Sequence, residues 1–169
     1  SVGVPKSAWD ELRAILSDSA ERLRQRVVVT GMGAVTAVGL NARETWENLM
    51  AGRSGIGFVT QFDASPYPSR IAAEVKGFDP NKITVVSPKE VKRLARCSQF
   101  AVAATEEALN DARLPWPLDE GDRAGVVIGT GLGGFELYRQ GIGEMVLKHT
   151  NRILPHLAIG GLPNMPAFY

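Results

Sequence analysis

Three glycines, Gly129, Gly131 and Gly134, have the G-x-G-x-x-G spacing of turns that hold the pyrophosphate of a dinucleotide. They follow an apolar run at residues 124–128 and precede a helical pattern, whose N-terminus could bind a phosphate. Dinucleotide sites also have an acidic residue at the end of the next strand, and residues 152–155 offer none. We therefore favour a simpler interpretation, in which these glycines let the backbone pass close to other backbone or to a ligand.

Nucleophiles and general bases are scarce in this sequence. The single cysteine, Cys97, can form neither an internal disulfide nor a thiolate metal cluster, and the two histidines are His149 and His156. Cys97 falls inside a predicted helix, without a helix N-terminus beneath it, so we interpret it as a small core residue. Glu106 and Glu107 are adjacent on the same helix and are interpreted as a solvated face. The sequence thus predicts no catalytic centre and no metal site within this chain.

Composition and charge restrict the class of protein. Of the 169 residues, 44% are hydrophobic and 22% are charged, with a net charge of +1, which is typical of a globular domain and gives no field that would attract nucleic acid or a membrane surface. No apolar run approaches the length of a membrane span. With one cysteine, we expect a reducing, cytoplasmic location. The chain begins at Ser1 and ends in the apolar residues 166–169, so we expect both ends to be cut or processed ones.

An amphipathic helix is predicted at residues 7–25. Trp9, Leu12, Leu16 and Leu23 recur at spacings of three, four and seven and would share one face. Such a stripe usually packs on the body of the protein, and the alternative is a docking helix for a partner. We treat residues 1–25 as an N-terminal extension and residues 26–169 as the main domain.

Strand and helix patterns alternate through the main domain. Residues 26–30 and 124–128 are short β-branched runs typical of buried strands, and residues 70–76 could form another. Helices are predicted at residues 42–51, from Ser87 to about 112, and at 135–149. Ser87, followed by a proline and then a glutamate, is a strong helix start, and the later alanines should let this helix lie close to its neighbours. The alternation predicts an α/β fold with a largely parallel core sheet.

Several of these segments, in the same order, resemble landmarks of β-ketoacyl-acyl carrier protein synthases. The resemblance covers about residues 26–169 and is greatest to the elongating, type II enzymes of fatty acid synthesis. The matching segments are residues 26–36, 45–56, 62–63, 129–134 and 163–165.

This resemblance implies a thiolase-like fold, in which two duplicated halves build a layered αβαβα architecture within a homodimer. The chain would supply most of the N-terminal half. The family's nucleophilic cysteine lies beyond the position of Tyr169, and its catalytic histidines and lysine follow later. Cys97 does not match the nucleophile. No catalytic residue is therefore expected in this chain, which should be inactive alone.

Some functional positions carry over from the family. Leu132 matches the aliphatic residue of the glycine loop that gates the acyl pocket, although plain core packing is an equal alternative for a leucine. His156 and Leu157 match residues at the pocket floor, where the partner subunit is met. The family usually has more apolar residues there, so His156 leaves the depth and polarity of the pocket open.

A basic patch is predicted to dock the acidic acyl carrier protein. Lys89, Lys92 and Arg93 match this patch, and Arg152 matches a second basic position. Their spacing of three and four residues would place the first three on one helix face, which would attract a negatively charged partner. The alternative is an ordinary solvated helix start. No cofactor is expected, because the carrier protein itself bears the phosphopantetheine.

The resemblance implies an acyltransferase that condenses acyl and malonyl carrier-protein thioesters by a decarboxylative Claisen reaction. A ketosynthase of a polyketide pathway is the alternative within the enzyme class, and the N-terminal helix slightly favours it. A non-catalytic, chain-length-determining partner is a further alternative. A dinucleotide-binding module is the weakest of these interpretations.

Overall fold

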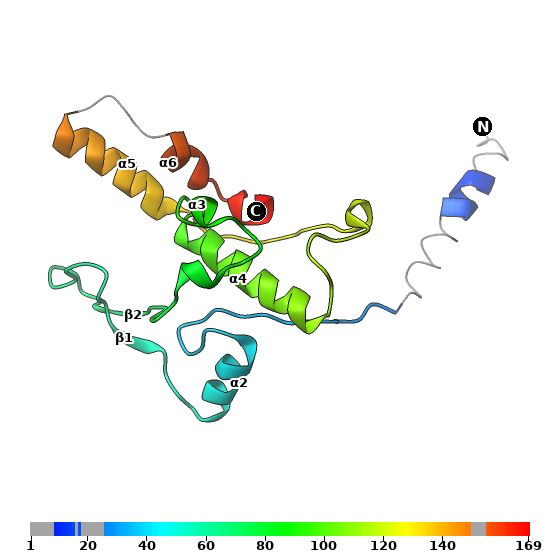
Figure 1. Ribbon diagram of the computed structural model, residues 1–169, viewed down its shortest axis with the longest axis horizontal. Coiled ribbons are helices and arrows are strands. Elements are labelled where there is room, and N and C mark those ends of the chain that lie inside the picture. The colour runs from blue at the N-terminus through cyan, green and yellow to red at the C-terminus, as the bar shows by residue number, and fades with distance from the viewer. Residues whose placement is uncertain (1–8, 16, 18–25, 150–154) are drawn as a thin grey trace, which may run out of the picture.

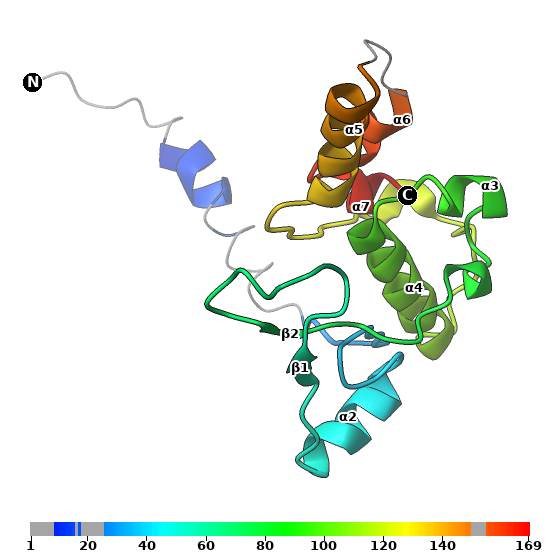
Figure 2. The same cartoon turned by 90° about the vertical axis from the view of Figure 1, so that its left-hand side faces the viewer.

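The computed structural model describes residues 9–15, 17, 26–149 and 155–169. α4 lies near the centre of Figure 1, and both ribbon views place α5 and α6 near its beginning and the segment leading to α2 near its end (Figures 1 and 2). No helix among the described residues is long and apolar enough to cross a membrane. In chain order the elements are α2 Ala42–Met50, β1 Ile56–Phe58, β2 Ile71–Ala73, the 3₁₀ turn η1 Pro80–Lys82, α3 Pro88–Val91, α4 Arg96–Asp111, the 3₁₀ turn η2 Gly121–Arg123, α5 Phe135–Lys148, α6 Pro155–Gly160 and α7 Met165–Phe168.

A small hydrophobic core forms around α3 and the first half of α4. Ser87 caps α3 by accepting a hydrogen bond from the backbone N–H of Glu90, as the sequence predicts. The prediction of one long helix from Ser87 to about residue 112 is wrong, however, because α3 ends at Val91 and α4 begins only after Ala95. This break turns Leu94, 5% exposed, into the core. The core residues are Ile83, Val91, Leu94 and Val102, with Phe78, Val85, Val86, Ala103 and Tyr169 packed against them.

The alanine-rich part of α4 lies directly against the segment that follows residue 30, as predicted. A Cβ atom on Gly31 would lie 2.1 Å from the carbonyl oxygen of Ala108, and one on Gly33 would lie 1.9 Å from that of Ala104. Only glycine allows so close an approach of two backbones. The glycines therefore fix how residues 30–34 run along the helix.

Carboxylates of α4 hold the chain that crosses it. Oε2 of Glu107 accepts a hydrogen bond from the N–H of Ala34, and its Oε1 accepts one from the N–H of Ala42, both at 2.9 Å. Glu106 accepts hydrogen bonds from the N–H and hydroxyl of Thr84. The interpretation of Glu106 and Glu107 as a solvated face is wrong, because both are half-buried and satisfy backbone groups of segments far away in sequence.

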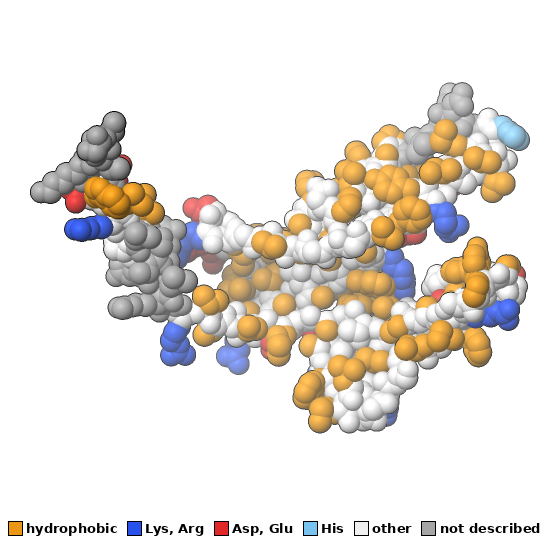
Figure 3. Space-filling model, turned by 180° about the vertical axis from the view of Figure 1, so that it is seen from behind, with side chains coloured by type: hydrophobic (Ala, Val, Ile, Leu, Met, Phe, Trp, Pro, Cys, Tyr) orange, Lys and Arg blue, Asp and Glu red, His pale blue; other side chains and the backbone are white. Residues whose placement is uncertain are grey.

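Residues 26–30 and 124–128 do not form the buried strands that their β-branched side chains predict. Within the described part of the chain they pair with no strand, and Val27 and Val127 are 94% and 98% exposed. Both segments run beside α4, and a helix offers a strand no ladder of hydrogen bonds. Apolar side chains accordingly lie over much of the visible surface (Figure 3).

The sheet that does form is short and antiparallel. β1 pairs with β2, with Ile56 opposite Ala73 and Phe58 opposite Ile71. The strand predicted at residues 70–76 is confirmed in its first half, whereas its partner β1 was not predicted. The expected largely parallel core sheet is absent from the described residues.

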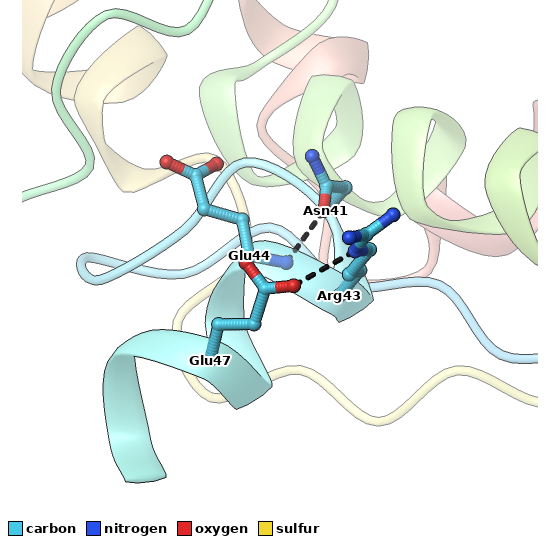
Figure 4. A network of polar contacts seen from close by, with 4 residues as sticks. All are labelled: Asn41, Arg43, Glu44 and Glu47. Atoms are coloured by element: carbon cyan, nitrogen blue, oxygen red, sulfur yellow. Dashed lines mark hydrogen bonds and ion pairs between the residues drawn. The ribbon is translucent and has the colours of Figure 1, made fainter. Parts of the chain in front are cut away.

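α2 is confirmed but leaves its apolar face uncovered. Its cap Asn41 accepts a hydrogen bond from the N–H of Glu44 at 2.7 Å, and Arg43 pairs with Glu47 at 2.8 Å (Figure 4). This hydrogen bond with Glu47 raises the pKa of Arg43. The apolar side of the helix is open to solvent, with Trp46, Leu49 and Met50 at 64%, 56% and 69% exposure.

The N-terminal helix is described only at residues 9–15 and 17. Trp9 and Leu12 are 56% and 47% exposed, so for these two residues the interpretation of a face packed on the body is wrong. Leu16 and Leu23 lie outside the described residues. A docking role for this helix stays a prediction.

Candidate functional site

The glycine loop, residues 129–134, is tied to the turn that follows α6. The hydroxyl of Thr130 donates to the carbonyl of Pro163 at 2.8 Å, and the N–H of Gly134 donates to the carbonyl of Gly161 at 3.1 Å. Gly133 has a φ of +60°, and a Cβ on it would lie 2.8 Å from Cα of Pro163. The close approach of backbone to backbone is therefore confirmed at this end of the loop.

The same contacts disfavour a phosphate at the start of α5. The N–H of Gly134, which a phosphate would use, already has a partner in Gly161, and Glu136 adds a negative charge to the first turn. A Cβ on Gly129 or Gly131 would meet nothing within 4 Å, so the beginning of the loop faces open space.

The start of α4 is held by residues from two other segments. The N–H of Arg96 donates to Oε1 of Glu136 at 2.6 Å. The Arg96 guanidinium lies over the rings of Phe78 and Phe100, at 5.9 and 4.8 Å from their centroids, and donates to the carbonyl of Val75 at 2.9 Å. Sequence reasoning missed both Arg96 and Glu136. An acid two residues after the last loop glycine is a visible signal, but its partner lies 40 residues away.

Cys97 occupies a different place from the one predicted. The break after α3 puts it in the first turn of α4, so the expectation that no helix N-terminus lies beneath it is wrong. It is half-buried and lines a cavity together with Phe100, Ile128, Pro166 and the glycine loop, including Leu132. No histidine among the described residues lines this cavity.

The predicted acyl-pocket residues do not come together in one cavity. Leu132 is 77% exposed and lines the cavity beside Cys97. Leu157 is 3% exposed and lines a separate apolar cavity between α5 and α6, with Tyr138 and Ile142. His156 is half-buried and lines neither of these two cavities. Their assigned roles stay predictions.

The predicted docking residues lie at α3 and the turn after it. Lys89 is on α3, Lys92 is its C-cap and Arg93 follows. All three are exposed, while Val91 and Leu94 beside them are buried in the core, so the basic side chains face outward. None of the three forms a salt bridge with another described residue. Arg152 lies outside the described residues.

The basic turn, residues 89–93, touches α6, and Ala95 just after it touches the last glycine of the glycine loop. A Cβ on Gly134 would lie 2.5 Å from Cβ of Ala95, and one on Gly160 would lie 3.3 Å from the carbonyl oxygen of Arg93. A basic outer surface and a loop with an exposed leucine are thus joined through the few residues between α3 and α4.

Residues 24–167 match the family model of the N-terminal domain of β-ketoacyl synthases. The chain belongs to this family. A curated relative from Synechocystis sp., 3-oxoacyl-[acyl-carrier-protein] synthase 2, is 40% identical over 84% of the chain, and its namesake from Staphylococcus aureus is 37% identical over 83%. The chain spans 34% of the length of each of these relatives.

Solved β-ketoacyl synthases share this chain's fold, which confirms the expected N-terminal half of a thiolase-like architecture. The ishigamide ketosynthase/chain length factor superposes with a TM-score of 0.70 at 29% identity, over 85% of this chain and 35% of its own. A β-ketoacyl synthase from Burkholderia phymatum gives 0.68 at 31% identity, with the same coverage of both chains. AntDE:AntF, a polyketide ketosynthase in complex with its acyl-carrier protein, gives 0.66 at 21% identity and supports the fold alone.

Proposed function

We propose that this chain forms the carrier-docking surface and one wall of the acyl pocket of an elongating β-ketoacyl-acyl carrier protein synthase. The observation that carries the proposal is the contact of Gly134 in the glycine loop with Ala95, two residues after the outward-facing basic turn, in a chain that belongs to this family. The names of its curated relatives support the same activity.

The basic turn would act first, by attracting the carrier protein. Lys89, Lys92 and Arg93 are exposed, and within the described chain they have no acidic partner in a salt bridge. Their charges are therefore available to an acidic carrier protein, whose encounter they would accelerate. The phosphopantetheine arm borne by the carrier would then present its acyl thioester near the glycine loop.

The chemistry itself would be done by groups outside this sequence. In the family, a cysteine thiolate accepts the acyl chain, and two histidines assist decarboxylation of the malonyl thioester and stabilise the oxyanion. By the resemblance these residues follow the position of Tyr169, so the 169-residue chain alone should transfer no acyl group.

We further propose a cytoplasmic homodimer. The exposed β-branched residues 26–30 and 124–128 and the apolar side of α2 support an assembly in which other polypeptide covers them. In the family, both the second half of the same protein and the partner subunit would contribute this cover.

Charge reversal of the docking turn tests the proposal. In the full-length protein, changing Lys92 and Arg93 together to Glu should lower kcat/KM for acyl carrier protein by about 10- to 100-fold. The variant loses the attraction between these side chains and the acidic carrier protein, and the new glutamates repel it. Turnover of a small acyl thioester should change by less than about twofold, because it does not use this surface.

A double variant in α2 and the loop after it, Arg43→Glu with Arg53→Glu, is the matched control, because it makes the same change of charge on exposed residues elsewhere. It should leave the ratio of the two activities unchanged. Equal losses on carrier protein and small thioester in the Lys92 and Arg93 variant would refute carrier docking at this turn.

A polyketide ketosynthase is the second candidate, because the ishigamide ketosynthase/chain length factor superposes with a TM-score of 0.70. The products separate the two. A single condensation yielding a 3-oxoacyl carrier protein supports fatty acid elongation, whereas repeated condensation to an unreduced polyketone supports the polyketide role.

A further inference from the structure

Hydrogen bonds fix the glycine loop near both of its ends, but they do not involve its most exposed side chain, Leu132. Thr130 and Gly134 are bonded to the turn after α6, as described above. Leu132 lies between them and is 77% exposed, so its own packing contributes little to its position. The place of this leucine is therefore set by what fixes the ends of the loop.

Glu136 connects one end of the loop to the start of α4. The N-cap residue of α4 is Ala95, which has no side chain able to accept a hydrogen bond from the helix. The carboxylate of Glu136 supplies that acceptor from outside, at 2.6 Å from the N of Arg96. A negative group at a helix N-terminus is favourable both as a hydrogen-bond acceptor and toward the helix dipole.

The contact between Gly134 and Ala95 makes this connection close. A Cβ on Gly134 would be only 2.5 Å from Cβ of Ala95, so the loop backbone is pressed against the residue just before Arg96. If the Glu136 bond were lost, the unsatisfied N–H of Arg96 would have to find water. The end of the loop would keep its bond to Gly161 but lose this tie to α4, which lets it shift relative to the helix.

We propose that Glu136 is a positioning residue that fixes Leu132 relative to α4 and thereby sets the acyl chain lengths that the enzyme accepts. This inference rests on the proposed function, in which Leu132 borders the acyl pocket. In an apolar pocket, a single methylene group changes discrimination between substrates by about 10- to 200-fold, so a small shift of Leu132 has a measurable consequence.

Substitutions of Glu136 in the full-length protein test this role. In Glu136→Ala, the ratio of kcat/KM for long to short saturated acyl carrier proteins should change by about 5- to 10-fold, because the end of the loop loses its tie to α4. KM for the carrier protein itself should stay within about twofold, because Lys92 and Arg93 are untouched. Glu136→Gln keeps an acceptor oxygen and should restore the wild-type ratio, and it also serves if the alanine variant does not fold.

Glu144→Ala is the matched control on the same helix, because among the residues that the structure describes the side chain of Glu144 pairs only with Lys148, at 3.6 Å. It should leave the chain-length ratio unchanged. Equal losses at every chain length in Glu136→Ala, or an unchanged ratio, would overturn the proposed role.

Amide hydrogen exchange provides a readout that does not depend on activity. In Glu136→Ala the N–H groups of Arg96 and Gly134 should exchange at least about tenfold faster, and in Glu136→Gln they should remain protected. Unchanged exchange at both amides would overturn the inference. Faster exchange in Glu136→Ala, together with a wild-type protein that catalyses no condensation, would uphold the positioning role and refute the proposed function.

Discussion

The two ends of α4 are stabilised in different ways. At its beginning, Val91 and Leu94 are buried and α7 packs on the helix, so side-chain packing holds that end. At its end, the crossing segment with Gly31 and Gly33 is fixed by backbone contact and by carboxylates, while the valines just before it, residues 27–29, stay exposed. The beginning of α4 packs against residues of this chain. The segments at its end have the composition of buried strands, but within the described residues they form no sheet.

Removing a core side chain should have the largest effect, and only at the packed end. Leu94→Ala should lower the free energy of unfolding of the full-length protein by about 2–4 kcal/mol, because it leaves a cavity between α3 and α4. Leu147→Ala on α5, whose side chain is 81% exposed, is the comparison and should change it by less than about 1 kcal/mol. Urea titration measures both, and similar losses would contradict the difference between the packed core and an exposed helix face.

Removing a carboxylate should instead weaken the other end. Glu107→Ala leaves the N–H groups of Ala34 and Ala42 without their acceptor, and we expect a loss of about 1.5–3 kcal/mol in unfolding free energy. Glu107→Gln keeps one acceptor oxygen and should lose about half as much. Glu47→Ala, which breaks only an exposed pair with Arg43, is the control. A loss in Glu107→Ala no larger than in Glu47→Ala would contradict the clamp.

The smallest effect is expected in the β1–β2 hairpin, which carries a pH-dependent contact. The hydroxyl of Thr60, and then its backbone N–H, donate to Glu74 and lower the pKa of that carboxyl. Because the folded-state pKa is the lower one, this contact stabilises the fold above the unfolded pKa and is lost as pH falls through the folded value.

Replacing Thr60 isolates this contribution. Thr60→Ala should raise the pKa of Glu74 toward its ordinary value, whereas Thr60→Ser keeps the hydroxyl and should leave it low. The NMR titration of the Glu74 side chain measures the change. An unaltered midpoint in Thr60→Ala would show that the hydroxyl does not interact with the carboxylate in solution.

Local signals in the sequence predicted the features that local interactions decide. The cap at Ser87, the helices α2 and α5 and the exposure of Lys89, Lys92 and Arg93 depend on residues near one another along the chain. The break between α3 and α4 has no proline or glycine to announce it. It follows from the burial of Leu94 and Ala95, which is a tertiary effect.

Interactions between distant segments account for the remaining errors. Glu107 accepts hydrogen bonds from Ala42 and Ala34, which lie 65 and 73 positions away along the chain. Neither its residue type nor its neighbours in the sequence reveal this role. Strand formation at residues 26–30 and 124–128 requires neighbours that the described chain does not provide, although their side chains have the composition of buried strands. The resemblance to β-ketoacyl synthases, which uses several separate segments at once, was confirmed where single patterns such as the glycine spacing were ambiguous.

A condensation assay on the full-length protein tests the central claim most directly. The protein would be incubated with an acyl carrier protein and malonyl carrier protein, and the products identified by mass spectrometry. The account predicts a 3-oxoacyl carrier protein longer by one two-carbon unit, together with release of carbon dioxide. Intact substrates after prolonged incubation, with a protein shown to be folded, would contradict it.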